Sequence, residues 1–157
     1  MTKNGIVLTV VAVLLAAVYA FFFTDWFIKP TIQIIPTIRP GRASAIPRND
    51  DSEPVCPVSF SFDGKYKLTA IKVVNAGEFA TNKYASPLWH MISDSNSLPT
   101  KSIVYGFKVP GMKPAVPRAK PEPLDPDTPY VLLVEAGNVK SQTNFHTSKL
   151  IPLGRPQ

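Results

Sequence analysis

Few side chains of this sequence have the types and the spacing that catalysis requires. His90 and Asp94 lie four residues apart in the stretch PLWHMISDSNS, and a histidine beside a carboxylate can transfer protons as a general acid or base. In an extended strand, however, Trp89 and Met91 would point to the face opposite to His90, which favours a half-exposed structural position for the histidine. An enzyme with a site near His90 and Asp94 therefore ranks behind binding functions, and we expect no catalytic residue.

The other candidate ligands and nucleophiles lack the spacing of a metal, cofactor or hydrolase site. Cys56 is the one cysteine of the chain, so no disulfide within the chain and no pair of cysteine ligands for zinc can form. His90, His146 and Cys56 are far apart in the sequence, so they could bind one metal ion only if the fold brought them together. The serines between residues 93 and 102 accompany no nucleophile elbow, and the glycines form no phosphate loop. The sequence predicts neither a metal nor a cofactor.

A proline-rich connection over residues 110–129 is the strongest sequence candidate for an interaction surface. It holds seven prolines in 20 residues, and a stiff segment loses little conformational entropy when it binds. A passive loop along the edge of the domain is the alternative. The side chains expected to contact a partner mix apolar and basic types: Met112, Lys113, Val116, Arg118 and Lys120.

The positive charge of the chain is modest and evenly divided. The net charge is +6, of which residues 1–50 contribute +3 (five basic minus two acidic) and residues 51–157 contribute +3 (twelve minus nine). A nucleic-acid-binding protein would gather basic residues on one face, together with aromatic side chains that stack on bases. We therefore expect no nucleic-acid partner.

The N-terminal region has the composition of a membrane anchor. From Gly5 to Phe23 the chain runs for 19 residues without a charge. As a helix this run would measure about 28 Å, close to the roughly 30 Å of a bilayer's hydrocarbon core. Aromatic residues then cluster where the helix would leave the lipid, from Phe21 to Phe27. The pattern predicts an anchor over residues 1–28, with a transmembrane helix at about residues 5–23 in contact with lipid.

A cleaved signal peptide is the alternative to an anchor. Val18 and Ala20 supply small residues at the spacing that a signal peptidase accepts. The uncharged run is longer than the roughly 7 to 15 residues of a typical signal core, which favours an uncleaved anchor.

Two arguments about the orientation of this anchor disagree. Lys29, Arg39 and Arg42 come after the apolar run, and positive residues favour the cytoplasmic side. A very short leader before a hydrophobic run is instead typical of a signal anchor that exports the C-terminal part of the chain. We expect a single-pass membrane protein whose C-terminal domain is extracytoplasmic.

The rest of the chain is predicted to be a spacer and then an all-β domain. Residues 29–53 are proline-rich and basic, although the β-branched residues within 31–38 are compatible with a short strand. Short alternating runs separated by turn residues predict a domain over residues 54–150, with a tail over 151–157. Strands are expected at residues 58–62, 66–74, 88–92, 102–109 and 130–136, with a last one within 138–150.

Local patterns add three details to these strands. Asp63-Gly64 is a turn signal and predicts a hairpin between the first two strands. The alternation shifts near Ala70, which predicts a β-bulge there. In the fourth strand, four residues are expected to share one face: Ile103, Tyr105, Phe107 and Val109.

One motif specifies the kind of β domain. Leu124 and Tyr130 are six residues apart in LDPDTPY, directly before an alternating strand. This resembles the tyrosine corner of fibronectin type III and immunoglobulin-like domains. The resemblance implies a β-sandwich in which the tyrosine begins strand F, packs beside the leucine and bonds the backbone upstream. The cysteine pair and tryptophan of antibody domains have no counterpart, and the 110–129 connection is longer than usual.

The leading functional hypothesis is a non-enzymatic, membrane-anchored interaction or structural module. Such a module would be an accessory or a subunit of an envelope complex, with membrane lipid and an unidentified protein as its partners. A carbohydrate- or peptide-binding accessory domain is the alternative, because sandwiches host both activities and a fold alone does not give a function.

Overall fold

The computed structural model describes residues 3–23, 31–39, 46, 55–93 and 97–149, and it divides into two compact units. The first unit, Met1–Pro30, contains helix α1 (Lys3–Phe23). The second unit, Thr31–Gln157, contains all the strands. The aromatic side chains expected at the exit from the lipid and the predicted tail over 151–157 lie outside the described residues.

Helix α1 is built almost entirely from apolar side chains, and those that the structure describes are exposed. Leu8, Val13 and Leu15 are more than 60% exposed, and the Thr9 hydroxyl donates to the Gly5 carbonyl oxygen at 2.9 Å. Within the described part of the chain, no helix meets the length and hydrophobicity that crossing a membrane requires.

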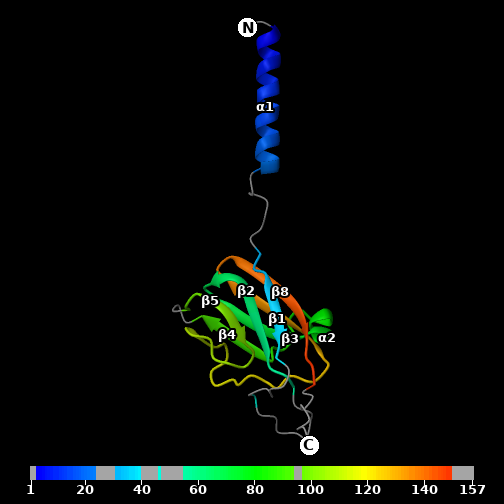
Figure 1. Ribbon diagram of the computed structural model, residues 1–157, viewed down its shortest axis with the longest axis vertical. Coiled ribbons are helices and arrows are strands. Elements are labelled where there is room, and N and C mark those ends of the chain that lie inside the picture. Colours follow the sequence, from blue (N-terminus) through cyan, green and yellow to red (C-terminus); the bar gives the residue numbers. More distant parts are fainter. Residues whose placement is uncertain (1–2, 24–30, 40–45, 47–54, 94–96, 150–157) are drawn as a thin grey trace, which may run out of the picture. The chain divides into compact units, whose positions relative to one another are not determined.

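The second unit is a β-sandwich of two antiparallel sheets, as the sequence predicted (Figure 1). One sheet has the order β1-β2-β5, formed by β1 (Ile34–Ile38), β2 (Val58–Tyr66) and β5 (Thr100–Val104). The other has the order β6-β4-β3-β7-β8. Its strands are β3 (Ala70–Asn75), β4 (Trp89–Ser93), β6 (Met112–Pro114), β7 (Pro129–Ala136) and β8 (Val139–His146).

A single hydrophobic core lies between the sheets because each strand turns alternate residues inward. Phe60 in β2 and Leu132 in β7 are fully buried, and the Phe60 ring meets that of Phe145 in β8 edge to face, 5.0 Å between centroids. Each large apolar side chain buried in this way stabilises the fold by about 1.5–3 kcal/mol. A six-residue helix, α2 (Ala76–Thr81), comes directly after β3 and is capped by the Asn75 side chain.

One side of the sandwich is closed by contacts between β1 and β8. Ile32 is buried just before β1, and its carbonyl oxygen accepts a hydrogen bond from the Ser141 hydroxyl of β8 at 2.6 Å. Pro36 lies in β1, where a residue without an N–H is tolerated because β1 is an edge strand. β1 lies inside residues 29–53, so the sandwich begins within the segment that the sequence assigned to a spacer.

The predicted hairpin at Asp63-Gly64 is wrong. β2 continues through both residues to Tyr66, and the next strand, β3, belongs to the other sheet. The first half of β2 is buried except at Ser61, which is partly exposed. It pairs with β1 on one side and with β5 on the other. Asp63 and Gly64 instead lie between Ser61 and Tyr66, where the register of the pairing of β2 with β5 shifts. The bulge expected near Ala70 is absent from the β3 pairings, which run without a break.

The predicted strand over residues 102–109 is correct only in its first half. β5 ends at Val104, and the Phe107 N–H donates to the Val104 carbonyl oxygen at 3.2 Å, which closes a turn. Gly106 has a φ of 79°, so the alternation of side chains breaks there. Ile103, Tyr105 and Val109 are buried as expected, whereas Phe107 is 51% exposed.

Candidate interaction groove

The proline-rich connection is attached to the edge of the five-stranded sheet at two points. After β6 pairs with β4, the Ala115 N–H donates to the His90 carbonyl oxygen at 3.0 Å. The Glu122 N–H donates to the Leu88 carbonyl oxygen at 2.9 Å. Between these two hydrogen bonds the chain leaves the edge of β4, and we call this part, residues 116–121, the excursion loop.

The excursion loop begins with a tight turn. The Ala119 N–H donates to the Val116 carbonyl oxygen at 3.0 Å, and Arg118 has a φ of 65°. Proline at the second position and a positive φ at the third are the pattern of a type II turn, and Pro117 and Arg118 occupy these positions. The turn leaves Arg118 exposed and Val116 64% exposed.

A second wall faces the excursion loop and is formed by the turn after β5. The Tyr105 hydroxyl donates to the Glu122 carbonyl oxygen at 2.7 Å, and burial raises the pKa of Tyr105, which keeps this donor protonated. The Tyr105 and Trp89 rings meet edge to face at 5.4 Å. Gly106 cannot be replaced without a shift, because a Cβ there would lie 2.4 Å from the Cδ1 atom of Ile46.

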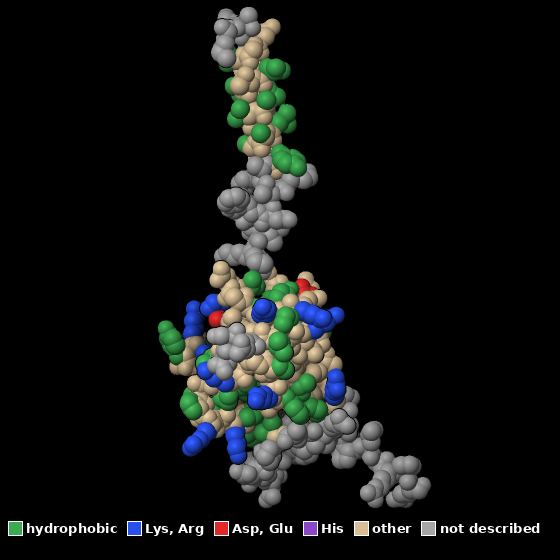
Figure 2. All heavy atoms as spheres, turned by 90° about the vertical axis from the view of Figure 1, so that its left-hand side faces the viewer, with side chains coloured by type: hydrophobic (Ala, Val, Ile, Leu, Met, Phe, Trp, Pro, Cys, Tyr) green, Lys and Arg blue, Asp and Glu red, His purple; other side chains and the backbone are tan. Residues whose placement is uncertain are grey.

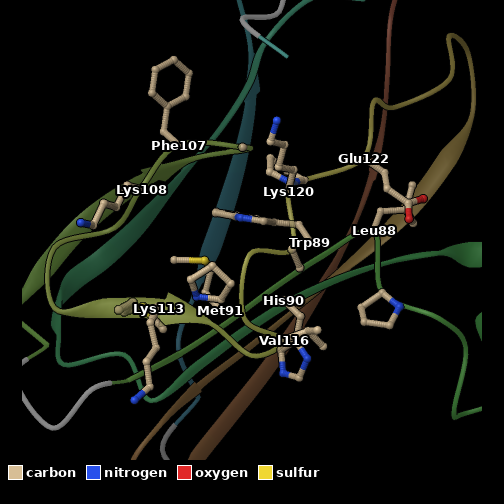
Figure 3. Close-up of a pocket in the computed structure, with 16 residues that line it drawn as sticks. Leu88, Trp89, His90, Met91, Phe107, Lys108, Lys113, Val116, Lys120 and Glu122 are labelled. Atoms are coloured by element: carbon tan, nitrogen blue, oxygen red, sulfur yellow. The ribbon is translucent and has the colours of Figure 1, made fainter. Parts of the chain in front are cut away.

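These two walls and the edge of β4 enclose a groove of about 570 Å³, which we call the β4–β6 groove (Figure 3). Its floor consists of Trp89, Met91 and Met112, which are at most 4% exposed. Its rim carries the exposed apolar side chains of Phe107 and Val116. Figure 3 shows the Phe107 ring projecting outward from the rim.

Positive charge predominates around the β4–β6 groove. Lys108, Lys113 and Lys120 line it from three different segments, with Glu122 as the acidic lining residue. Figure 3 shows these lysines on different sides of Trp89 and Met91. The face shown in Figure 2 carries many lysine and arginine side chains among hydrophobic ones and few acidic side chains.

His90 lies on the side of β4 that faces away from the core. It pairs with Lys72 of β3, and Figure 3 shows its ring beside Val116 and pointing away from Trp89. Burial lowers the pKa of His90, Lys72 lowers it further, and Glu135 opposes the shift. Because the lowered pKa keeps the imidazole neutral at pH 7, His90 adds no positive charge to the groove.

The other residues considered for chemistry are not gathered into a site. Cys56 is buried, and its thiol donates to the Lys149 carbonyl oxygen at 3.6 Å, while His146 is exposed at the end of β8. Asp94 lies outside the described residues. In the described ranges, no group of three or more His, Cys, Asp or Glu side chains is placed to hold a metal ion.

The structure brings most of the predicted interaction residues together. Lys113, Val116, Arg118 and Lys120 are exposed on β6 and the excursion loop. Met112 is the exception, since β6 turns it into the core, where it is 3% exposed and forms part of the floor.

Sequence reasoning missed the opposite wall, Phe107 and Lys108. The positive φ of Gly106 ends the alternation of β5 and turns these two side chains outward. The glycine directly before them was the available signal, because a glycine inside a strand pattern often marks a break.

Hydrogen bonds of Tyr130 and Thr147 fix the chain where the proline-rich connection ends. The Asp125 N–H donates to the Tyr130 hydroxyl oxygen at 2.8 Å, and Tyr130 and Leu124 are both buried in the core. Thr147, which is 2% exposed, donates its hydroxyl proton to the Asp125 carbonyl oxygen and accepts from the Thr128 N–H. These bonds hold the chain just after Glu122, the residue that follows the excursion loop.

The chain matches no family model, no curated protein and no solved structure. Its function must therefore be argued from the geometry of the β4–β6 groove. A partly apolar groove with a few polar or charged groups at its rim is the usual form of a binding site.

Proposed function

We propose that this protein is a non-enzymatic interaction or structural module, held to a membrane by its N-terminal helix and serving as an accessory or a subunit of an envelope complex. The observation that carries the proposal is the β4–β6 groove, where exposed Phe107 and Val116 flank buried Trp89. Exposed apolar side chains such as these become buried when a partner docks, and a few residues of this kind carry most of the binding energy of an interface.

The construction of the groove supports a binding function over a passive loop. The residues on either side of the excursion loop are bonded to His90 and Leu88, and the Tyr105 hydroxyl ties the opposite wall to Glu122. A surface held in one conformation before binding loses less entropy when a partner docks.

We further propose that the sandwich is of the fibronectin type III or immunoglobulin-like kind. The orders β1-β2-β5 and β3-β7-β8 correspond to strands A-B-E and C-F-G of those domains, with Tyr130 in strand F. β4 extends the second sheet beside β3, as an added C′ strand does. β6 has no counterpart in that scheme and is the addition that builds the groove.

The membrane tether and the export of the sandwich are supported by the sequence of the first unit. The sequence from Gly5 to Phe23 holds 19 uncharged residues, about the number that a spanning helix needs, although the described part of α1 by itself does not meet the criterion for a membrane span. We propose that this run acts as a signal anchor, which exports the part of the chain that follows it. In that arrangement the β4–β6 groove meets partners outside the cytoplasm.

Site-specific photocrosslinking in cells tests the interaction surface. A benzophenone amino acid would be placed at Val116 or Phe107, with Tyr84 as the matched control because it is 93% exposed in a different loop. We expect discrete adducts of defined mass from the two groove positions and none from Tyr84. Equal adducts from all three positions, or none from the groove, would overturn the proposed function.

A further inference from the structure

We infer that the β4–β6 groove binds an acidic peptide segment of a partner protein, one that carries apolar side chains between its acidic residues. This inference rests on the proposed function, since it names the ligand of the same groove. Three observations carry it: the charges at the rim, the apolar lining and the size of the groove.

The charges select an anionic ligand. Three lysines line the groove, Lys108, Lys113 and Lys120, and Glu122 is the acidic residue among its lining. Arg118 is exposed on the excursion loop, which also carries Lys120. Because the lysines come from separate segments, carboxylates at several points along a bound chain can meet them. Electrostatic complementarity of this kind raises the association rate and excludes basic partners.

The apolar lining selects a peptide over an anionic saccharide. Trp89 is 4% exposed and meets the Tyr105 ring at 5.4 Å, so this tryptophan offers no open face on which a sugar ring could stack. The exposed apolar surface of the groove comes from the side chains of Val116 and Phe107. Leucine or phenylalanine side chains of a peptide can pack against this surface.

The size of the groove limits how much of a partner it can hold. Its volume of about 570 Å³ lies in the range of pockets that enclose small ligands, about 300–1,000 Å³. A few residues of a peptide fit such a space, whereas a folded domain would contact only the rim.

The experiment measures binding of synthetic peptides to the full chain in non-ionic detergent, by fluorescence anisotropy at low salt. The probe has a central Leu-Phe-Leu with three glutamates on each side. One comparison peptide replaces the glutamates with lysines, a second replaces the centre with serines, and a heparin-derived oligosaccharide serves as the anionic saccharide. We expect saturable binding of the probe. Each of the three comparison ligands should bind at least about tenfold more weakly.

Charge reversal in the protein supplies the matched control. The double variant Lys108→Glu/Lys120→Glu should bind the probe at least about tenfold more weakly. Lys67→Glu/Lys83→Glu makes the same change in net charge at exposed positions outside the groove and should keep binding within about twofold of the parent. Equal thermal unfolding of the two variants would show that both fold.

The outcomes separate this inference from the function it rests on. Groove-specific crosslinks without binding of the probe would overturn the acidic-peptide ligand and leave the interaction module standing. Tighter binding of the oligosaccharide, or equal loss in both double variants, would also overturn it. Failure of the crosslinks and of peptide binding together would remove both proposals.

Discussion

Tyr130 and Leu124 show how single residues hold one end of the sandwich in place. The Tyr130 hydroxyl satisfies the Asp125 N–H, and the Tyr130 ring stacks with that of Phe145 at 5.7 Å. The bond is partly buried although Asp125 itself is exposed, so water can replace it only in part. Single side chains such as Tyr130 therefore contribute directly to the stability of this end of the sandwich.

Removal of the Tyr130 hydroxyl should leave the Asp125 N–H without this partner. We expect Tyr130→Phe to lower the free energy of unfolding by about 1–3 kcal/mol. Leu124→Ala should lower it by about 2–5 kcal/mol through lost packing, and the double variant should lose less than the sum. Urea unfolding of residues 31–157 measures these changes, with Tyr84→Phe as an exposed control. Neutral single variants would contradict the corner.

His90 should make the stability of the domain depend on pH. Because burial lowers its pKa below the usual 6.5, the folded state prefers the neutral ring. The stabilisation is present above about pH 6.5, the ordinary pKa, and is lost as the pH falls through the lowered pKa. His90→Gln should therefore lose less stability than the parent between pH 7.5 and pH 5, as measured by urea unfolding. A parent and variant with parallel pH profiles would contradict this.

At the scale of elements, two short strands form edges of the sandwich: β1 is an edge of the three-stranded sheet, and β6 is an edge of the five-stranded sheet. β1 covers one side of β2, and Ile32 just before it lies in the core, where it is 1% exposed. β6 extends β4 and starts the excursion loop on the other side. Each is a few residues long, so each depends on the sheet that it joins rather than on its own propensity.

Deletion of β1 should destabilise the sandwich strongly. A fragment that begins at Asp51 lacks Ile32 and every hydrogen bond between β1 and β2, whereas one that begins at Thr31 keeps them. We expect the shorter fragment to be less stable by at least about 3 kcal/mol, since it loses buried apolar surface and exposes the edge of β2. Urea unfolding of both fragments measures the difference. Equal midpoints and slopes would mean that β1 is not part of the folded unit.

At the scale of the whole molecule, the chain joins an apolar helix to a folded domain that has its own core. The two units differ in what they bury, because α1 exposes its hydrophobic side chains and the sandwich encloses them. Exposed apolar surfaces of this kind are uncommon on monomeric soluble proteins, and the proposed membrane attachment would cover this one. This contrast motivates a test of membrane attachment and sidedness.

The full chain should fractionate with membranes and resist extraction by high salt and by carbonate, because an uncharged helix is retained by the hydrophobic effect. Protease added to cells with a permeabilised outer layer and an intact inner membrane should digest the sandwich. Immunoblotting and N-terminal sequencing read both results. A soluble protein whose N-terminus is Phe21 would contradict the anchor, and full protection from protease would contradict export.

The sequence by itself determined the all-β class, the position of most strands and the corner residues. These features arise from local patterns, since alternation of apolar residues and turn chemistry act within a few positions of the chain. Val58 to Phe62 and Tyr130 to Ala136 were placed in strands for this reason, and both segments form strands in the sandwich.

Only the tertiary structure decided which strands pair and how the β4–β6 groove is built. The Asp63-Gly64 signal favours a turn, but burial of β2 between β1 and β5 outweighs it. Phe107 and Val116 come from segments on opposite walls, and only the bonds at Leu88, His90 and Tyr105 bring those walls together. Contacts between residues distant in the chain carry no local signal, because they depend on the burial of the whole core.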